Sequence, residues 1–112
     1  MALPELRLGT DDAGRTVQVA AGDRLELRLP EVAGTGYTWT VEDLPPGAEV
    51  VEERYDHRPA GAIGGAAEHV FVISAPAAPG DVRLRHARPW EGAAGELERF
   101  TVTVVPAARR GA

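Results

Sequence analysis

Residues 24–29, RLELRL, alternate charged and apolar side chains without a break. Successive side chains of a β-strand point to opposite faces, so this stretch would place its leucines on one face and its charges on the other. A helix would instead need apolar residues three and four apart. The stretch therefore predicts a strand with one buried face. The inner residues would be Leu25, Leu27 and Leu29, and the outer ones Arg24, Glu26 and Arg28.

The same alternation recurs along the chain and indicates seven or eight short strands. Turn-forming residues separate the runs, as in LPPG at 44–47 and AAPGD at 77–81. No stretch carries a sustained apolar stripe with the 3.6-residue period of a helix. The predicted strands are 6–8, 16–20, 24–29, 37–41, 49–54, 69–75, 82–87 and 99–105.

This pattern predicts an all-β fold, an immunoglobulin-like β-sandwich of seven to eight antiparallel strands with Greek-key connections. The length of 112 residues fits one domain. We expect this domain to span residues 1–106 and residues 107–112 to form a disordered tail.

Composition excludes several classes of partner. The net charge is −5 and the arginines are scattered, so no nucleic-acid partner is expected. The chain has no cysteine, which excludes disulfides, thiolate metal sites and cysteine nucleophiles. Neither a membrane span nor a secretory signal is present, which predicts no membrane partner and, for the chain as given, a cytoplasmic location. Nothing indicates an obligate oligomer, so we expect a monomer.

The residue types that carry chemistry are few and dispersed. Ser74 lies inside a predicted apolar strand, which favours a locally bonded hydroxyl over a nucleophile. His57, His69 and His86 are separated by 12 and 17 residues and lack the paired spacing of metal ligands. Neighbouring carboxylates such as Glu52 and Glu53 are typical of a solvated surface. We therefore expect no enzyme activity, no catalytic residue, no metal and no cofactor.

Three connections have unusual composition, and each has a structural and a binding interpretation. Residues 29–39 contain small residues that are either a flexible link or a backbone able to approach a partner closely. The long stretch 56–69 carries Ile63 among glycines, either as an anchor for a partner or as a plug against the sandwich. In HARPWEG, residues 86–92, Trp90 is either a lid over the core or a binding residue.

Taken in order, these connections resemble the three loops of the chagasin-type inhibitors of papain-like cysteine proteases. The first family loop reads roughly N-P-T-T-G-[YF]-x-W, and VAGTGYTW, residues 32–39, keeps Thr35, Gly36, Tyr37 and Trp39. The second reads G-x-G-G, and GAIGG, residues 61–65, supplies Gly61, Gly64 and Gly65 with one extra residue. The third, R-P-[WF], is matched fully by Arg88, Pro89 and Trp90.

The resemblance implies an eight-stranded immunoglobulin-like sandwich that blocks the active-site cleft of a papain-like cysteine protease. Loops 32–37, 61–66 and 88–91 would lie across the cleft from one end of the sandwich. By the same resemblance, Trp39 would pack in the core. The implied protease-binding residues are Thr35, Gly36 and Tyr37 at the centre, Ile63, Gly64 and Gly65 in the second loop, and Arg88, Pro89 and Trp90 in the third.

The first loop departs from the family pattern. Val32 and Ala33 stand in place of the family's Asn-Pro, and Gly34 in place of a threonine. Losing a proline and gaining a glycine predicts a more flexible loop and a larger entropic cost of docking. Two alternatives to inhibition follow from the residues: an immunoglobulin-like interaction module that binds another protein, and a sandwich that binds a carbohydrate or small ligand on Trp90.

Overall fold

The structure is a computed structural model that describes residues 5–32, 34–57, 66–88, 90–91 and 96–107. All eight predicted strands are present, which confirms the all-β prediction. No helix within these ranges is long and apolar enough to cross a membrane. The elements are β1 Glu5–Leu8, the 3-10 turn η1 Thr10–Asp12, β2 Thr16–Ala20, β3 Arg24–Val32, β4 Thr38–Asp43, β5 Val50–His57, β6 Ala66–Ser74, β7 Gly80–Ala87 and β8 Glu96–Ala107.

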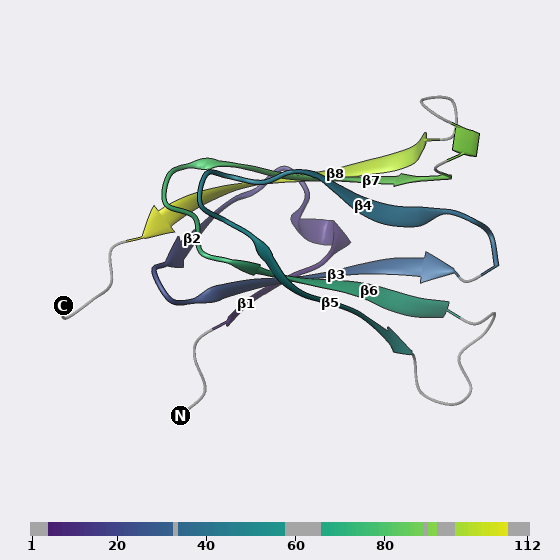
Figure 1. The fold of residues 1–112 in the computed structure, drawn as a ribbon, viewed down its shortest axis with the longest axis horizontal. Coiled ribbons are helices and arrows are strands. Elements are labelled where there is room, and N and C mark those ends of the chain that lie inside the picture. The colour runs from purple at the N-terminus through teal and green to yellow at the C-terminus, as the bar shows by residue number, and fades with distance from the viewer. Residues whose placement is uncertain (1–4, 33, 58–65, 89, 92–95, 108–112) are drawn as a thin grey trace.

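The strands form two four-stranded sheets that pack face to face (Figure 1). One sheet has the order β1-β3-β6-β5 and the other the order β2-β8-β7-β4. The pairs β5–β6 and β7–β8 are consecutive antiparallel neighbours within a sheet, while every other connection between the described strands crosses from one sheet to the other. This arrangement confirms the predicted sandwich.

Strand direction differs from the expectation at one edge of each sheet. β1 pairs with β3, and β2 with β8, in parallel rather than antiparallel register. After β1 the chain crosses through η1 to the other sheet, so β1 and β2 do not form a hairpin with each other. Apolar alternation is the same in parallel and antiparallel strands, and so the sequence pattern could not reveal this direction.

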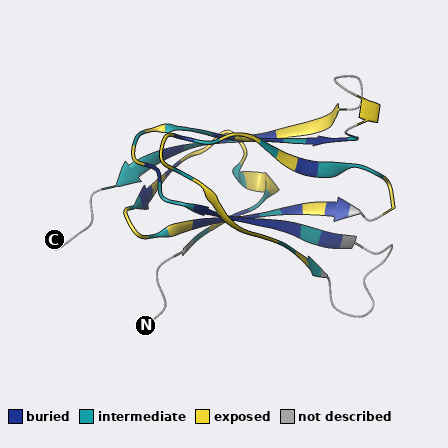
Figure 2. Ribbon diagram, in the orientation of Figure 1, coloured by how far each residue is buried: buried dark blue, intermediate teal, exposed yellow. Residues whose placement is uncertain are grey.

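The core lies between the two sheets and consists of the inward-facing residues of the alternating runs. Figure 2 shows buried residues along the strands of both sheets. Leu25, Leu27 and Leu29 of β3 are at most 1% exposed, as predicted from RLELRL. They pack in one cluster with residues of the second sheet, among them Leu84 and Phe100. Burial of this apolar surface is the main favourable contribution to folding.

Several strands are longer than the sequence pattern predicted. β5 and β6 continue their pairing through Asp56 with Glu68 and His57 with Ala67, within a stretch that we expected to be loop. Ala66, expected at the end of the second loop, is the first residue of β6. β8 runs to Ala107, one residue into the expected tail. Backbone pairing to a neighbouring strand here overrides the weak strand propensity of alanine and charged residues.

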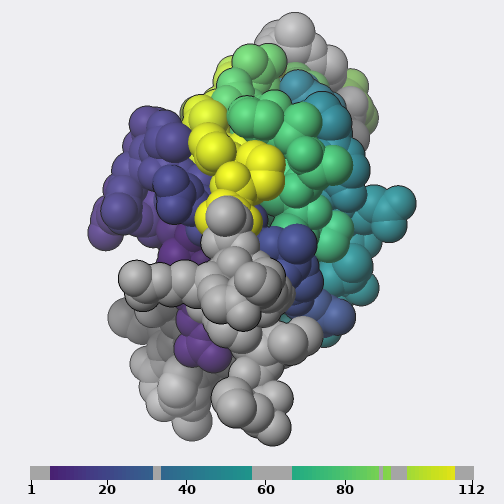
Figure 3. Space-filling view, turned by 90° about the vertical axis from the view of Figure 1, so that its left-hand side faces the viewer, coloured from purple at the N-terminus to yellow at the C-terminus, as the bar shows by residue number. Residues whose placement is uncertain are grey.

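The end of the sandwich opposite the β3–β4 connection is closed by two packed connections. Ala77 N donates to the Pro46 carbonyl oxygen at 2.8 Å, which joins the β6–β7 connection to the β4–β5 connection. A Cβ on Gly80 would lie 2.8 Å from Pro45 Cα, so only glycine fits there. Figure 3 looks at this end, where the last residues of β8 lie between β2 and the segment around β7.

Candidate functional site

The strands that flank the three predicted loops have their loop-side ends at the same end of the sandwich. β3, β5 and β7 end there, and β4, β6 and β8 begin there (Figure 1). The structure describes residues 34–37 of the first loop and Arg88, Trp90 and Glu91 of the third. Ile63, Gly64, Gly65 and Pro89, which we predicted as binding residues, lie outside the described residues, as do Gly61 and Ala33.

The described part of the first loop is built on two glycines with left-handed backbone. Gly34 has φ +85° and Gly36 has φ +84°, a conformation that other residues adopt only with strain. Between them, Thr35 is exposed, and its Oγ1 accepts a hydrogen bond from Tyr37 N at 3.3 Å. The loop therefore presents backbone and a small side chain to the solvent.

The third loop packs directly on the first. Arg88 Nε donates to the Thr35 carbonyl oxygen at 2.9 Å, and the Arg88 guanidinium lies 4.3 Å from the centre of the Tyr37 ring. A Cβ on Gly36 would overlap Cη2 of Trp90 and lie 3.0 Å from its Cζ2, so the indole rests on the Gly36 backbone. The structure thus brings together five of the predicted residues, from two loops.

Trp90 is nevertheless 70% exposed. The interpretation of Trp90 as a lid over the core is therefore wrong. Glu91 N donates to the Arg88 carbonyl oxygen at 3.1 Å, which forms a turn that presents the indole to solvent. A large exposed aromatic side chain of this kind is the residue type most enriched at the energetic centres of protein interfaces.

A buried carboxylate holds the base of the first loop. Glu31 Oε1 accepts hydrogen bonds from Trp39 N at 2.9 Å and from Thr38 Oγ1 at 3.1 Å, and lies 3.0 Å from His69 Nδ1. Burial alone would raise the pKa of the Glu31 carboxyl, but the bonds from Trp39, His69 and Thr38 outweigh it and bring the pKa below its ordinary value of 4.5. The residues that flank the loop are therefore tied together through one ionised group.

Trp39 packs in the core, as the resemblance implied, and is 2% exposed. Its Nε1 donates to the Pro30 carbonyl oxygen at 3.0 Å. Its ring stacks on His86 with a centroid distance of 4.5 Å and an interplanar angle of 11°. On the loop side, the ring centroids of His86 and Tyr37 lie 5.9 Å apart in an edge-to-face arrangement. A column of rings thus runs from the core to the first loop.

Sequence reasoning missed the roles of Glu31, His69 and His86 beneath the loops. The spacing of the histidines bears only on metal binding, and no group of metal-ligating side chains that could hold an ion occurs among the described residues. His69 bonds carboxylates on both sides, with Nε2 2.7 Å from Glu53 Oε2, and His86 Nδ1 lies 3.2 Å from Glu98 Oε1. A polar residue at the inward position of an alternating strand is the signal that could have identified His69.

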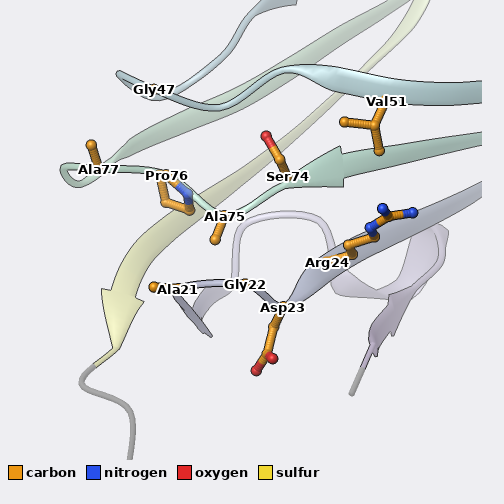
Figure 4. A pocket seen from close by; sticks show the side chains of 10 residues that line it. All are labelled: Ala21, Gly22, Asp23, Arg24, Gly47, Val51, Ser74, Ala75, Pro76 and Ala77. Carbon is orange, nitrogen blue, oxygen red and sulfur yellow. The ribbon is translucent and has the colours of Figure 1, made fainter. Parts of the chain in front are cut away.

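The other chemical candidates have structural roles. The Ser74 hydroxyl accepts from Glu49 N at 2.9 Å. The serine is therefore hydrogen-bonded, but its partner is 25 residues away in sequence, so the prediction of a local bond is wrong. A separate hollow of about 500 Å³ lies at the opposite end of the sandwich (Figure 4). Its lining is mostly small, including Gly22, Ala75 and Ala77, with Val51 on one side. This hollow carries no grouping that predicts a reaction.

The sequence of this chain matches one known protein family. The family model described as "Chagasin family peptidase inhibitor I42" matches residues 18–104. Chagasin from Trypanosoma cruzi is 36% identical over 95 residues, which cover 80% of this chain and 86% of that protein.

Solved structures agree in fold. The cysteine protease inhibitor EhICP2 from Entamoeba histolytica has a TM-score of 0.79 at 21% identity, covering 92% of this chain and 96% of that one. PbICP-C, solved in complex with falcipain-2, has a TM-score of 0.50 at 19% identity, covering 94% of this chain and 98% of that one.

Proposed function

The chain belongs to the chagasin family of peptidase inhibitors, and from this premise we propose that it inhibits papain-like cysteine proteases by inserting the loops at one end of the sandwich into the active-site cleft. The family consists of inhibitors and not of enzymes, in agreement with the expectation from the sequence. Inhibition of this kind needs occlusion of the cleft and no reaction by the inhibitor. The bound state of PbICP-C with falcipain-2 is in line with this mode of action.

One observation carries the proposal: the exposed Trp90 indole lies against the glycine-containing first loop at the same end of the sandwich. Glycine and threonine at the tip let the backbone approach the floor of a narrow cleft. A neighbouring aromatic side chain adds a large apolar contact to one side of it. The backbone of the first loop, with the Trp90 ring beside it, therefore has a shape that suits a groove-like active site.

In this proposal the first loop occupies the centre of the cleft through Thr35, Gly36 and Tyr37. The third loop lies on one side and contacts the protease through Trp90, with Arg88 and Pro89 fixing its position. Ile63, Gly64 and Gly65 of the second loop would provide contacts on the other side. A sandwich that holds its loops in place lowers the entropic cost of ordering them on binding.

The direct test is to titrate the purified protein against papain and against a cathepsin L-type protease. We expect inhibition of at least one enzyme at micromolar concentration or below. Trp90→Ala should weaken this inhibition by about 1–3 kcal/mol, because truncation removes the large aromatic contact on one side of the cleft.

Val51→Ala is the matched control. Val51 is 46% exposed and lines the hollow at the opposite end, so its truncation should leave the inhibition constant unchanged. If the wild-type protein inhibited neither enzyme, the interaction-module alternative would replace inhibition. If Trp90→Ala inhibited as strongly as the wild type, the assignment of the third loop would be wrong.

A further inference from the structure

The first loop contains two glycines with positive φ, and yet its tip residues have defined partners outside the loop. A segment of this composition has high conformational entropy when free. It therefore needs other parts of the molecule to hold it in one conformation. Those parts are the flanking strands at its base and the third loop at its tip.

We infer that Arg88 and Trp90 are positioning residues that lock the first loop in its binding conformation before a protease is met. The inference rests on the proposed function and goes beyond it, because it assigns these residues a role in the free protein. The first and third loops then act as one preassembled unit. We call the contacts of Arg88 and Trp90 with Thr35, Gly36 and Tyr37 the interloop lock.

Arg88 supplies the polar part of the interloop lock. Its Nε donates a hydrogen bond to the Thr35 carbonyl oxygen at 2.9 Å, and its Cζ lies 4.3 Å from the centroid of the Tyr37 ring. Its Nη1 also lies 3.6 Å from Glu91 Oε2 within the third loop. A planar guanidinium can donate to a carbonyl and stack on a ring at once, which the lysine ammonium cannot do. Arg88 is thus occupied inside the inhibitor rather than extended towards a partner.

Trp90 supplies the apolar part. Its indole covers Gly36 closely enough that no side chain fits at that position, although most of the ring remains open to solvent. Gly36 keeps an intermediate exposure, and the indole restricts movement of its backbone on the covered side. Trp90 is therefore placed to serve both as a support for the first loop and as a contact for the protease.

The interloop lock is anchored in the core. Tyr37, which lies under the Arg88 guanidinium, meets the His86 ring edge-to-face, and His86 stacks on the buried Trp39. His86 also lies within hydrogen-bond distance of Glu98, with 3.2 Å between Nδ1 and Oε1. The position of the loop tip is thereby coupled to rigid strand residues. Loss of Arg88 would separate the tip from this support while leaving the column below intact.

The first test uses the free protein and ¹⁵N relaxation of the amides of residues 34–37. The wild type should show order parameters near those of rigid backbone, about 0.85, and Arg88→Ala should lower them below about 0.6. The indole N–H signal of Trp39 should stay unchanged, because it reports the folded core. Unchanged order parameters in both Arg88→Ala and Trp90→Ala would overturn the inference.

A matched pair of glycine substitutions tests the Trp90 contact. Gly34 and Gly36 have nearly the same φ, but a Cβ on Gly34 meets nothing within 4 Å, whereas one on Gly36 overlaps the indole. Gly36→Ala should shift the Trp90 indole N–H signal strongly, and Gly34→Ala should leave it near its wild-type position. Equal shifts in the two variants would mean that backbone strain, not contact with Trp90, is responsible.

Binding kinetics with papain link the interloop lock to function. If Arg88→Ala reduces the binding-competent fraction of the free protein to about a tenth, affinity falls about tenfold. We expect most of this loss in the association rate, because the loop must be ordered before or during docking. A loss confined to the dissociation rate would indicate a direct contact of Arg88 with the protease instead. The relaxation measurements do not depend on inhibition, so failure of the proposed function would be seen separately.

Discussion

Glu31 is the single residue on which the base of the first loop depends most. Its Oε1 receives bonds from the backbone of Trp39 and the hydroxyl of Thr38, and it faces the buried ring of His69. Glu31→Ala would leave these groups without their acceptor in a mostly buried site. We expect a loss of roughly 1–3 kcal/mol in the free energy of unfolding, measured by urea denaturation at neutral pH.

Glu91→Ala provides the comparison for this prediction. Glu91 is exposed, and its carboxylate faces Arg88 at 3.6 Å, so its removal should change stability by less than about 0.5 kcal/mol. If both variants were equally stable, the bonds at Glu31 would contribute nothing beyond those of a surface residue.

At this scale the sequence predicted the tip of the site better than its support. The residues Thr35, Gly36, Tyr37, Arg88 and Trp90 were identified from motif order, and the structure brings them together. Glu31 and His69 are 38 residues apart, and their contact depends on strand register that no local pattern encodes. The orientation of Trp90 was also open, because composition alone does not distinguish a lid from an exposed ring.

At the scale of elements, the outer face of the β1-β3-β6-β5 sheet is covered by charged residues that form one network. Glu26 is 3% exposed, and its carboxylate meets Arg28 Nε at 2.9 Å and Arg54 Nη2 at 3.3 Å. Between these arginines lies Val70, which is fully buried although it is on the outer face. The arginine stems and the ion pairs together close this face against water.

Arg28→Ala should therefore destabilise the protein more than removal of an ordinary surface arginine. It would uncover Val70 and take one partner from the buried Glu26, for a loss of roughly 1–3 kcal/mol. Arg83→Ala is the control, because Arg83 is 51% exposed in its side chain and pairs with Asp81 at 3.2 Å. Its loss should stay below about 1 kcal/mol. Equal losses in thermal or urea denaturation would mean that the network acts as separate surface pairs.

The alternating pattern predicted every strand, because a strand with one buried face alternates apolar and polar residues along the sequence. The ends and directions of the strands depend on their neighbours instead. β3 continues through Pro30, which lacks an N–H, and this is possible because β1 accompanies β3 only as far as Leu27. The sequence around Pro30 alone would end the strand, as we predicted, at Leu29.

For the whole molecule, the two ends of the sandwich differ in exposure and packing. The end with the first and third loops presents exposed glycine and tryptophan, while the opposite end is closed by close packing of Gly47 and Gly80 against neighbouring connections. Since the two ends are separated by the length of the strands (Figure 1), substitutions at one end should have little effect on the other. This separation is why Val51→Ala can serve as a control for inhibition.

The response of the molecule to acid follows from its carboxylates. The pKa is lowered for five described groups, which are Asp12, Glu26, Glu31, Asp56 and Asp81. For Glu26, burial raises the pKa, but the hydrogen bonds from Arg28 and Arg54 and the charges of Arg28 and Arg7 together outweigh it and lower the pKa. A carboxyl whose pKa is lower in the folded than in the unfolded protein stabilises the fold above its unfolded pKa, and this contribution disappears as the pH falls through the folded value.

Stability should therefore change little through these groups between about pH 7 and pH 5, and fall progressively below about pH 4.5. The urea midpoint measured across this range gives the direct check. Glu31→Ala should lose less stability on acidification than the wild type, because it has already lost one of the contributing carboxyls. A wild-type urea midpoint that stayed constant down to about pH 2.5 would contradict the assignment of these ion pairs. With the expected profile, the protein and its loop end stay folded in mildly acidic solution.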